Sequence, residues 1–366
     1  MINHHNNSDL NNLLYLPLQY SININTKNIN IMKIVRLLSM VLIFIYPQLH
    51  ILAQKDTVDI IPGKGKVSGR IFANFYTGIG KEDKTSAFEV RRAYFGYKAP
   101  IGHDFTAEVK LDIGSPNDLS EYSRIRRYAY FKTAALYYQH GKVFFKFGIF
   151  DIDHFDLQEK FWNHRYIYKS FQDEHRFGNK ADLGTSLHYK FLSGLSADIT
   201  IMNGEGYTDL QRDNAFKTGT GITFNPNSSL LFRVFVDFIK KKEVESTIST
   251  FAGYSRNPVS IGLEYNHKFN KYDLSGYNQN GISSYIMYRI NDRFEVFARY
   301  DRLASNILPE NSSPWNLAND GSAIIGGIQY QPVNVVKVAL DYQDWYPYAS
   351  NMDNLAYIFV HFEILF

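Results

Sequence analysis

The chain has 366 residues, enough for one large domain or two ordinary ones, and its formal net charge is +3. Aromatic residues make up 16% of the sequence, which favours β structure. The mean hydropathy of -0.28 excludes a bundle of apolar transmembrane helices. The absence of cysteine excludes disulfides and thiolate chemistry. No basic run resembles a nucleic-acid-binding patch, so we expect no nucleic acid among the partners.

The N-terminal region has the pattern of an export signal. Residues 1–31 are an Asn-rich extension, and Met32 is an alternative start that would leave them untranslated. Residues 32–53 are predicted to be a signal peptide, because Lys33 and Arg36 precede an apolar stretch that is too short to span a bilayer. A short buried helix is the alternative for this stretch. Ala53 is the expected cleavage residue, and residues 54–65 are then a short periplasmic segment.

The rest of the chain repeatedly alternates apolar and polar residues. Residues 105–113, 195–201, 259–265 and 294–300 show this period of two, which is typical of strands with one apolar and one polar face. The expected connections alternate between short turns and long polar loops such as 240–249 and 270–280. This layout predicts an all-β fold, a transmembrane antiparallel up-and-down β-barrel of about 16 strands over residues 66–366. A soluble β-sandwich is the alternative.

The C-terminal residues form a strand with an unbroken apolar face. Phe362, Ile364 and Phe366 continue an alternation that starts at Ala356. We expect this strand to pair with the first one and to face lipid. Its terminal Phe resembles the assembly signal that the barrel insertion machinery reads. Outer-membrane lipid and that machinery are therefore expected partners, and the outer membrane of a Gram-negative bacterium is the expected location.

Basic residues on the opposite face of the strands are predicted to line a water-filled lumen. By phase, the predicted pore-lining residues are Arg91, Arg124, Arg126, Lys132, Arg233 and Arg299. Because Arg91 and Arg92 are adjacent, we expect one of them to point outward, at a cost of a few kcal/mol in lipid. A subunit contact would avoid this cost, which motivates the expectation of an oligomer joined through the early strands. For any single charge, a salt-bridged wall position is the alternative.

The longest predicted connection spans roughly residues 150–177. A long third loop of a barrel this size is expected to fold into the lumen, with its acids opposite the basic cluster: Asp151, Asp153, Asp156 and Glu159. A solvated outer loop is the alternative. Asp151, Asp153, His154 and His164 could ligate a metal ion, but their spacing is a weak signal. We therefore expect no metal and no cofactor.

Residues 88–112 resemble the phosphate-selective porin O/P family. The matching residues are Phe88, Arg91, Arg92, Gly96, Lys98, Phe105, Glu108, Lys110, Leu111 and Asp112, with Gly148 and residues 182–184 further along. The resemblance implies a sixteen-stranded homotrimeric porin whose lumen favours anions. One departure is the acidic stretch from Asp151 to Asp156. After loss of residues 1–53 the net charge is about +1, because three basic and one acidic residue leave. A steeply phosphate-selective pore should be more basic.

These observations predict a diffusion channel for small polar or anionic solutes, phosphate-like ions included, that is not an enzyme and has no catalytic residue. Neither an HExxH nor a GxSxG motif is present. A barrel enzyme such as a lipid hydrolase and a loop-plugged structural or adhesive barrel are the alternatives. If Arg124 and Arg126 set selectivity, their replacement by Glu should shift the reversal potential in a KCl gradient.

Overall fold

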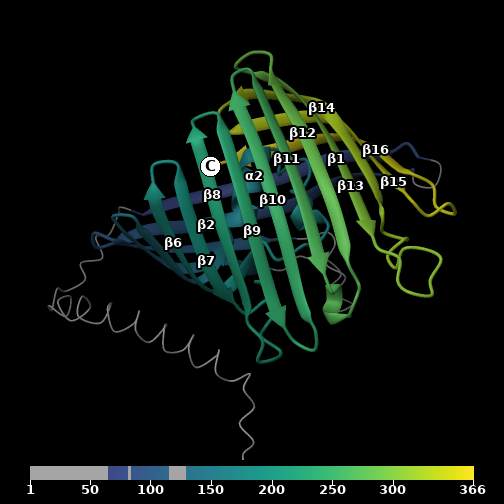
Figure 1. Ribbon diagram of the computed structural model, residues 1–366. Coiled ribbons are helices and arrows are strands. Elements are labelled where there is room, and N and C mark those ends of the chain that lie inside the picture. Colours follow the sequence, from purple (N-terminus) through teal and green to yellow (C-terminus); the bar gives the residue numbers. More distant parts are fainter. Residues whose placement is uncertain (1–64, 81–83, 115–128) are drawn as a thin grey trace, which may run out of the picture. The chain divides into compact units, whose positions relative to one another are not determined.

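The computed structural model describes residues 65–80, 84–114 and 129–366. In this part of the chain, sixteen antiparallel strands form one closed barrel, and β16 pairs with β1 to close it (Figure 1). The prediction of a sixteen-stranded up-and-down barrel is confirmed. None of the helices in the described residues is both long and apolar enough to cross a membrane.

The strands are mostly between nine and thirteen residues long. Their bounds are β1 Lys66–Gly78, β2 Ser86–Ile101, β3 Phe105–Ile113, β4 Ala129–His140, β5 Val143–Asp151, β6 Ala181–Leu192, β7 Leu195–Met202, β8 Lys217–Asn227, β9 Leu230–Lys240, β10 Val244–Arg256, β11 Val259–Phe269, β12 Gln279–Arg289, β13 Phe294–Ser305, β14 Gly321–Val333, β15 Val336–Pro347 and β16 Leu355–Leu365. The described helices are α2 Asp153–Trp162, α3 Phe171–Glu174 and the 3-10 helix η2 Lys271–Asp273.

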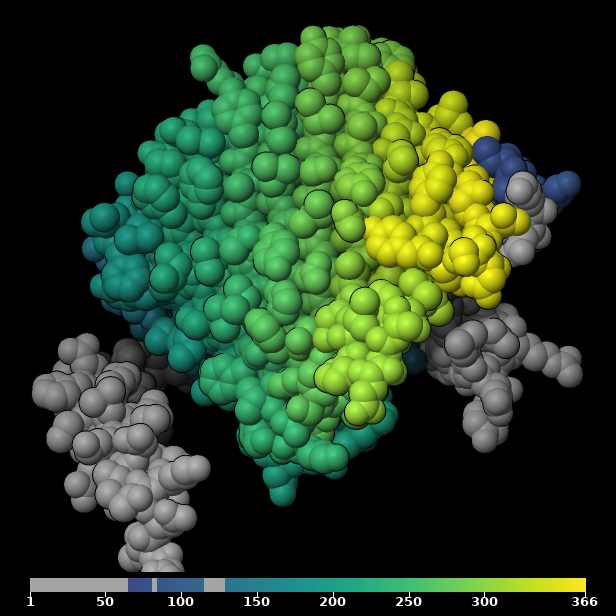
Figure 2. Space-filling model, turned by 45° about the vertical axis from the view of Figure 1, so that its right-hand side comes forward, coloured from purple at the N-terminus to yellow at the C-terminus, as the bar shows by residue number. Residues whose placement is uncertain are grey.

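Strand β9 shows how the period of two divides the wall into two faces. Val234 and Phe238 are exposed on the outside, whereas Arg233, Phe235 and Asp237 are buried on the inside. Figure 2 shows the outer side of the green and yellow strands as a continuous wall. An apolar outside around a polar interior is the arrangement that a lipid-embedded barrel needs.

One predicted loop is instead part of two strands. Only residues 241–243 separate β9 from β10, so the expected long connection over 240–249 is wrong. Its polar residues have a different cause, because Thr247 and Ser249 are buried on the inner face while Ile248 is exposed on the outer face. The polar character of this stretch reflects the barrel interior.

A β-bulge in β2 places both Arg91 and Arg92 inside the barrel. Phe72 of β1 pairs with Arg92 and the next residue, Ala73, pairs with Val90, so Arg91 is the extra residue. Arg91 Nη1 donates to the backbone oxygen of Ile167, 3.1 Å away. The expectation that one of the two arginines points outward is therefore wrong, and so is the argument for an oligomer that was based on it.

A second bulge shifts the phase of β4 at Lys132. Lys110 of β3 pairs with Thr133 and Leu111 pairs with Phe131, which leaves Lys132 unpaired in the register. Lys132 and Thr133 are both buried on the inner face, whereas simple alternation would direct Thr133 outward. The bulge in β2 thus adds an arginine to the lumen, whereas the bulge in β4 adds Thr133 beside Lys132.

The closing seam of the barrel contains a glycine without room for a side chain. The Gly69 N–H donates to Phe366 O at 2.7 Å, and the Phe366 N–H donates to Gly69 O at 3.0 Å. A Cβ atom on Gly69 would lie 2.1 Å from Cζ of the Phe366 ring. The ring therefore covers β1 directly at the point where the two ends of the sheet meet.

Replacing Gly69 with alanine is expected to displace the Phe366 ring and to destabilise the closed barrel by ~1–3 kcal/mol, a typical cost of overpacking. The folded fraction in unheated gel samples and the urea midpoint would measure this loss. Gly326→Ala is the matched control, because its added Cβ meets nothing nearer than 3.7 Å. Equal stability of the two variants would contradict the importance of this contact.

Candidate functional site: a loop inserted in the lumen

The connection between β5 and β6, residues 152–180, lies inside the barrel and is called the inserted loop below. Figure 1 shows its helix α2 behind the strands of the wall. Trp162, Tyr166 and Ile167 of this loop are fully buried and share one core cluster with wall residues such as Phe251 and Phe297. Apolar packing therefore holds the loop against β10 to β15.

Hydrogen bonds from the wall also fasten the inserted loop. The Tyr166 hydroxyl donates to Gln329 Oε1 at 2.8 Å. Arg299 Nη1 donates to the backbone oxygen of Lys169 at 2.8 Å, and Thr247 Oγ1 donates to that of Phe177 at 3.2 Å. Since these partners lie on β10, β13 and β14, the loop is fixed across a wide part of the interior.

Two predicted pore-lining arginines serve as buried anchors. Arg233 is 2% exposed and donates to both carboxylate oxygens of Asp198, at 2.7 and 2.9 Å. Arg299 is 3% exposed and bonds both oxygens of Asp301, at 2.8 and 2.7 Å. Bidentate pairing of this kind is strong and directional. Both arginines face the interior, and their charges are already compensated by the wall.

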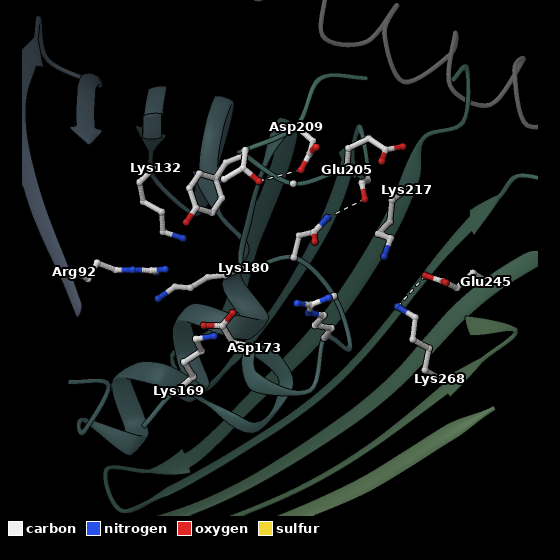
Figure 3. Close-up of a pocket in the computed structure, with 17 residues that line it drawn as sticks. Arg92, Lys132, Lys169, Asp173, Lys180, Glu205, Asp209, Lys217, Glu245 and Lys268 are labelled. Carbon is white, nitrogen blue, oxygen red and sulfur yellow. Dashed lines mark hydrogen bonds and ion pairs between the residues drawn. The ribbon is translucent and has the colours of Figure 1, made fainter. Parts of the chain in front are cut away.

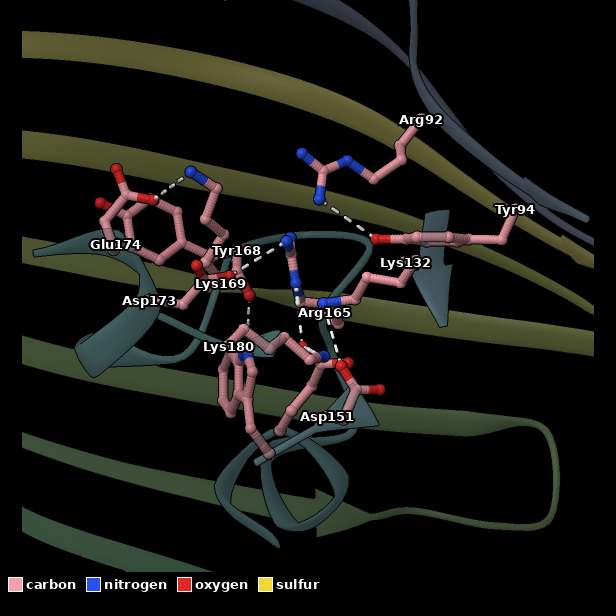
Figure 4. A network of polar contacts seen from close by, with 12 residues as sticks. Arg92, Tyr94, Lys132, Asp151, Arg165, Tyr168, Lys169, Asp173, Glu174 and Lys180 are labelled. Carbon is pink, nitrogen blue, oxygen red and sulfur yellow. Dashed lines mark hydrogen bonds and ion pairs between the residues drawn. The ribbon is translucent and has the colours of Figure 1, made fainter. Parts of the chain in front are cut away.

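The four predicted acids of the loop all pair with cations. Asp151 binds Lys132 at 2.9 Å, and Asp156 binds Lys160 at 2.6 Å. The two remaining acids form close ion pairs, Asp153 with Lys146 and Glu159 with Lys180. Figure 4 shows the resulting network around Arg165, which also binds Asp173 at 3.2 Å. Lys132 was among the predicted pore-lining residues and pairs with one loop acid. The partners of the other three acids, Lys146, Lys160 and Lys180, were not predicted.

Neighbouring charges keep the loop pairs ionised. Burial disfavours the charged form of Glu159, but Lys180 and Arg165 hold the pKa of this carboxyl below its usual value. Burial likewise opposes the charge on Lys180, while Glu159 and Asp151 raise its pKa above the usual value. Both partners therefore carry their charges at neutral pH.

A cavity of about 520 Å³ lies between the inserted loop and the connection from β7 to β8. Seven basic residues line it, against four acidic ones: Arg92, Lys132, Lys169, Arg176, Lys180, Lys217 and Lys268, and Asp173, Glu205, Asp209 and Glu245. In Figure 3 the side chains of Arg92, Lys132 and Lys180 direct their nitrogens toward a common space. The balance of charge on these walls attracts anions.

A second cavity, of about 340 Å³, is lined partly by Ser68, Gly69 and Leu365. These residues lie at the end of the barrel where the short turns connect the strands. The first cavity is instead lined by the long connection between β7 and β8, which lies at the opposite end. Lys132 and Lys180 line both cavities. These two ammonium groups therefore lie where the two spaces meet, along the wall formed by β1 to β4.

The remaining predicted residues have varied locations. Arg124 and Arg126 lie outside the described residues. Phe362, Ile364 and Phe366 are exposed on the outer face of the barrel. Five further basic residues line the first cavity and were not among the predicted site residues: Lys169, Arg176, Lys180, Lys217 and Lys268. Only Lys169 and Arg176 lie in the predicted long connection, where the number of charges was a signal.

One group of side chains has the proximity of a metal site. Ligand atoms of Asp153, His188 and Asp198 lie within 4.8 Å of one another. Both oxygens of Asp198 already accept hydrogen bonds from Arg233, and Asp153 pairs with Lys146. The carboxylates are thus engaged by cations of the protein, and this group does not fit a metal centre.

Comparison with known proteins identifies the fold. No family model and no curated protein matches the sequence significantly, so the resemblance to the O/P porins is not confirmed. OprB of Pseudomonas putida matches with a TM-score of 0.65 and 10% identity over 83% of this chain and 94% of the other. An anion-selective porin from Comamonas acidovorans matches with a TM-score of 0.59 and 10% identity, over 82% of this chain and 99% of the other. In-vitro folded OmpT, an outer membrane protein of Vibrio cholerae, matches in its trimer form with a TM-score of 0.55 and 10% identity. The match covers 82% of this chain and 99% of the other.

The closed strand order, the apolar outside and these likenesses define the class. The chain has the fold of a sixteen-stranded outer-membrane β-barrel.

Proposed function

We propose that this protein is a porin of the outer membrane, a passive channel through which small polar and anionic solutes diffuse. The observation that carries the proposal is the pair of basic cavities that meet at Lys132 and Lys180. A solute that follows this path passes both ammonium groups. Phosphate is one candidate among the small anions.

The loop acids limit how strongly the path attracts anions. Asp151 forms an ion pair with Lys132, and Glu159 forms one with Lys180. An entering anion therefore competes with a carboxylate for each ammonium group, which favours weak binding and rapid release, as conduction requires.

Planar-bilayer recording tests the proposal. We expect stable conductance steps and a reversal potential on the anion side in a KCl gradient. Cation selectivity would contradict the anion assignment. Silence together with hydrolysis of a lipid substrate would favour the enzyme alternative.

Neutralising the loop acids should strengthen the anion preference. Asp151→Asn and Glu159→Gln each free one ammonium group at the junction of the cavities. One unit charge at close range in water is worth ~1 kcal/mol, which corresponds to about a fivefold change in the ratio of anion to cation permeability. Reversal potentials measure the shift, and Asp104→Asn at a short turn is the control. A shift toward cations would contradict the proposed path.

A plugged structural barrel is the second candidate. It is favoured by the amount of apolar side chain that the inserted loop places in the lumen, including Trp162, Tyr166 and Phe171. For this candidate, the protein would not conduct until the loop is removed.

A homotrimer is part of the proposal. The resemblance to the O/P porins and the trimer form of the Vibrio cholerae protein support it. Light scattering of the detergent-solubilised protein would measure the number of subunits, and a monomer would contradict this part alone.

A further inference from the structure

A third cavity, of about 210 Å³, lies at the turn between β12 and β13, away from the two basic cavities. It is at the short-turn end of the barrel. Arg289 and Arg293 flank the turn, and neither guanidinium forms an ion pair with a described residue. Two guanidinium groups beside one cavity offer the fork of donors that carboxylates and phosphates bind.

Three of the four carboxamides that line this cavity have their oxygens occupied within the protein, whereas the fourth, Gln331, donates its NH₂ group to the backbone oxygen of Asn334. The side chain of Gln329 is 5% exposed, and its Oε1 already accepts from Tyr166. Asn163 Oδ1 lies 3.4 Å from Lys337 Nζ, which donates to it. Asn291 Oδ1 accepts from the backbone N–H groups of Arg293 and Phe294, at 2.9 and 3.0 Å. The oxygens are therefore used internally, and the three amide NH₂ groups remain for a ligand.

The charge of the lining limits the charge of the ligand. Asp292 and Glu295 also line the cavity, so the two arginines are opposed by two carboxylates. Glu295 in turn lies 3.1 Å from Nε2 of His164. A nearly balanced site suits a monoanion better than a dianion such as phosphate at neutral pH. The free NH₂ groups can donate hydrogen bonds, so a ligand that also carries amide or hydroxyl oxygens would fit better.

We propose that this cavity binds the carboxylate of a monoanionic ligand that also carries amide or hydroxyl oxygens. The guanidinium groups of Arg289 and Arg293 hold the carboxylate, and Gln329, Asn163 and Asn291 donate to the neighbouring oxygens. Two sources share this chemistry: dissolved monocarboxylates and the carboxylates of a cell-wall polymer. Binding here does not depend on conduction, so it goes beyond the proposed channel function.

Calorimetric titration of the full chain in detergent tests the site. N-acetylalanine is the probe, N-acetylalanine amide is the neutral control, and inorganic phosphate is the dianion. We expect binding of N-acetylalanine alone, weakened about tenfold or more by Arg289→Gln with Arg293→Gln, since hydrogen bonds to charged groups contribute ~1.5–3 kcal/mol. Arg302→Gln, on β13 but outside the cavity, should leave the affinity unchanged.

Several results would overturn the proposal: absence of N-acetylalanine binding, equal affinity in the double variant, or phosphate binding at least as tightly. Gel mobility of unheated samples verifies that each variant is folded. Gln329→Glu keeps an oxygen to accept from Tyr166 but replaces the NH₂ donor by a carboxylate oxygen, and it should give an independent loss of affinity.

Co-sedimentation with purified cell-wall sacculi identifies the source. Sedimentation that depends on the two arginines assigns the ligand to the polymer. Binding of N-acetylalanine without such sedimentation assigns it to dissolved solutes, and either outcome supports the carboxylate site.

Discussion

Replacing Lys132 and Lys180 together with methionine is expected to reverse or abolish the anion preference of the channel. These two ammonium groups line both basic cavities, and Asp151 and Glu159 remain in place when they are removed. Each lost unit charge is worth ~1 kcal/mol at close range in water, so the pair should lower the ratio of anion to cation permeability by about one to two orders of magnitude. The reversal potential in a KCl gradient measures this ratio.

The control for this experiment is Lys142→Met. Lys142 lies in the short turn between β4 and β5, where it donates to the backbone oxygen of Phe191. Its loss removes one unit charge, half of what the double variant removes, without changing either basic cavity. If the shift of the potential per unit charge is the same in both variants, selectivity comes from the overall charge of the protein and not from the junction of the cavities.

The barrel could be predicted from the sequence because lipid outside and water inside require strict alternation. The alternation failed just after Arg91 and Lys132, where bulges insert one residue and direct Arg92 and Thr133 inward as well. It also failed at residues 244–249, where polar residues that face the lumen were taken for a loop. In both cases the sequence contains the polar residues but not the pairing register that decides their direction.

The candidate site was harder to predict than the wall. The acids of the inserted loop were identified from their position in the longest connection, but their partners were not. Lys180 at the end of the loop meets Glu159 of α2. Lys217 begins β8 and Lys268 lies next to the last residue of β11, so both come from strands far away in the sequence. An irregular loop has no period, so its contacts follow from packing against the finished barrel.

Removing the inserted loop is expected to raise the single-channel conductance several-fold. The Ile152 N–H donates to Lys180 O at 2.9 Å, so the two ends of the loop already lie one hydrogen bond apart. Residues 153–179 can therefore be replaced by Asn-Gly, which forms a tight turn. The wall retains Lys132, Lys217 and Lys268, so a wider channel with a weaker anion preference should result. Planar-bilayer recording measures both quantities.

A point substitution separates constriction by the loop from a general loss of stability. Trp162→Ala removes the largest fully buried ring of the loop, at a typical cost of ~3–5 kcal/mol, while the strand pairing is unchanged. It should give larger and noisier conductance steps in a barrel that still migrates as folded. Trp315→Ala, in the connection between β13 and β14, is the matched control outside the lumen. Conductance that is unchanged after excision would show that the loop does not restrict the path, whereas a channel that conducts only after excision would establish the plugged barrel.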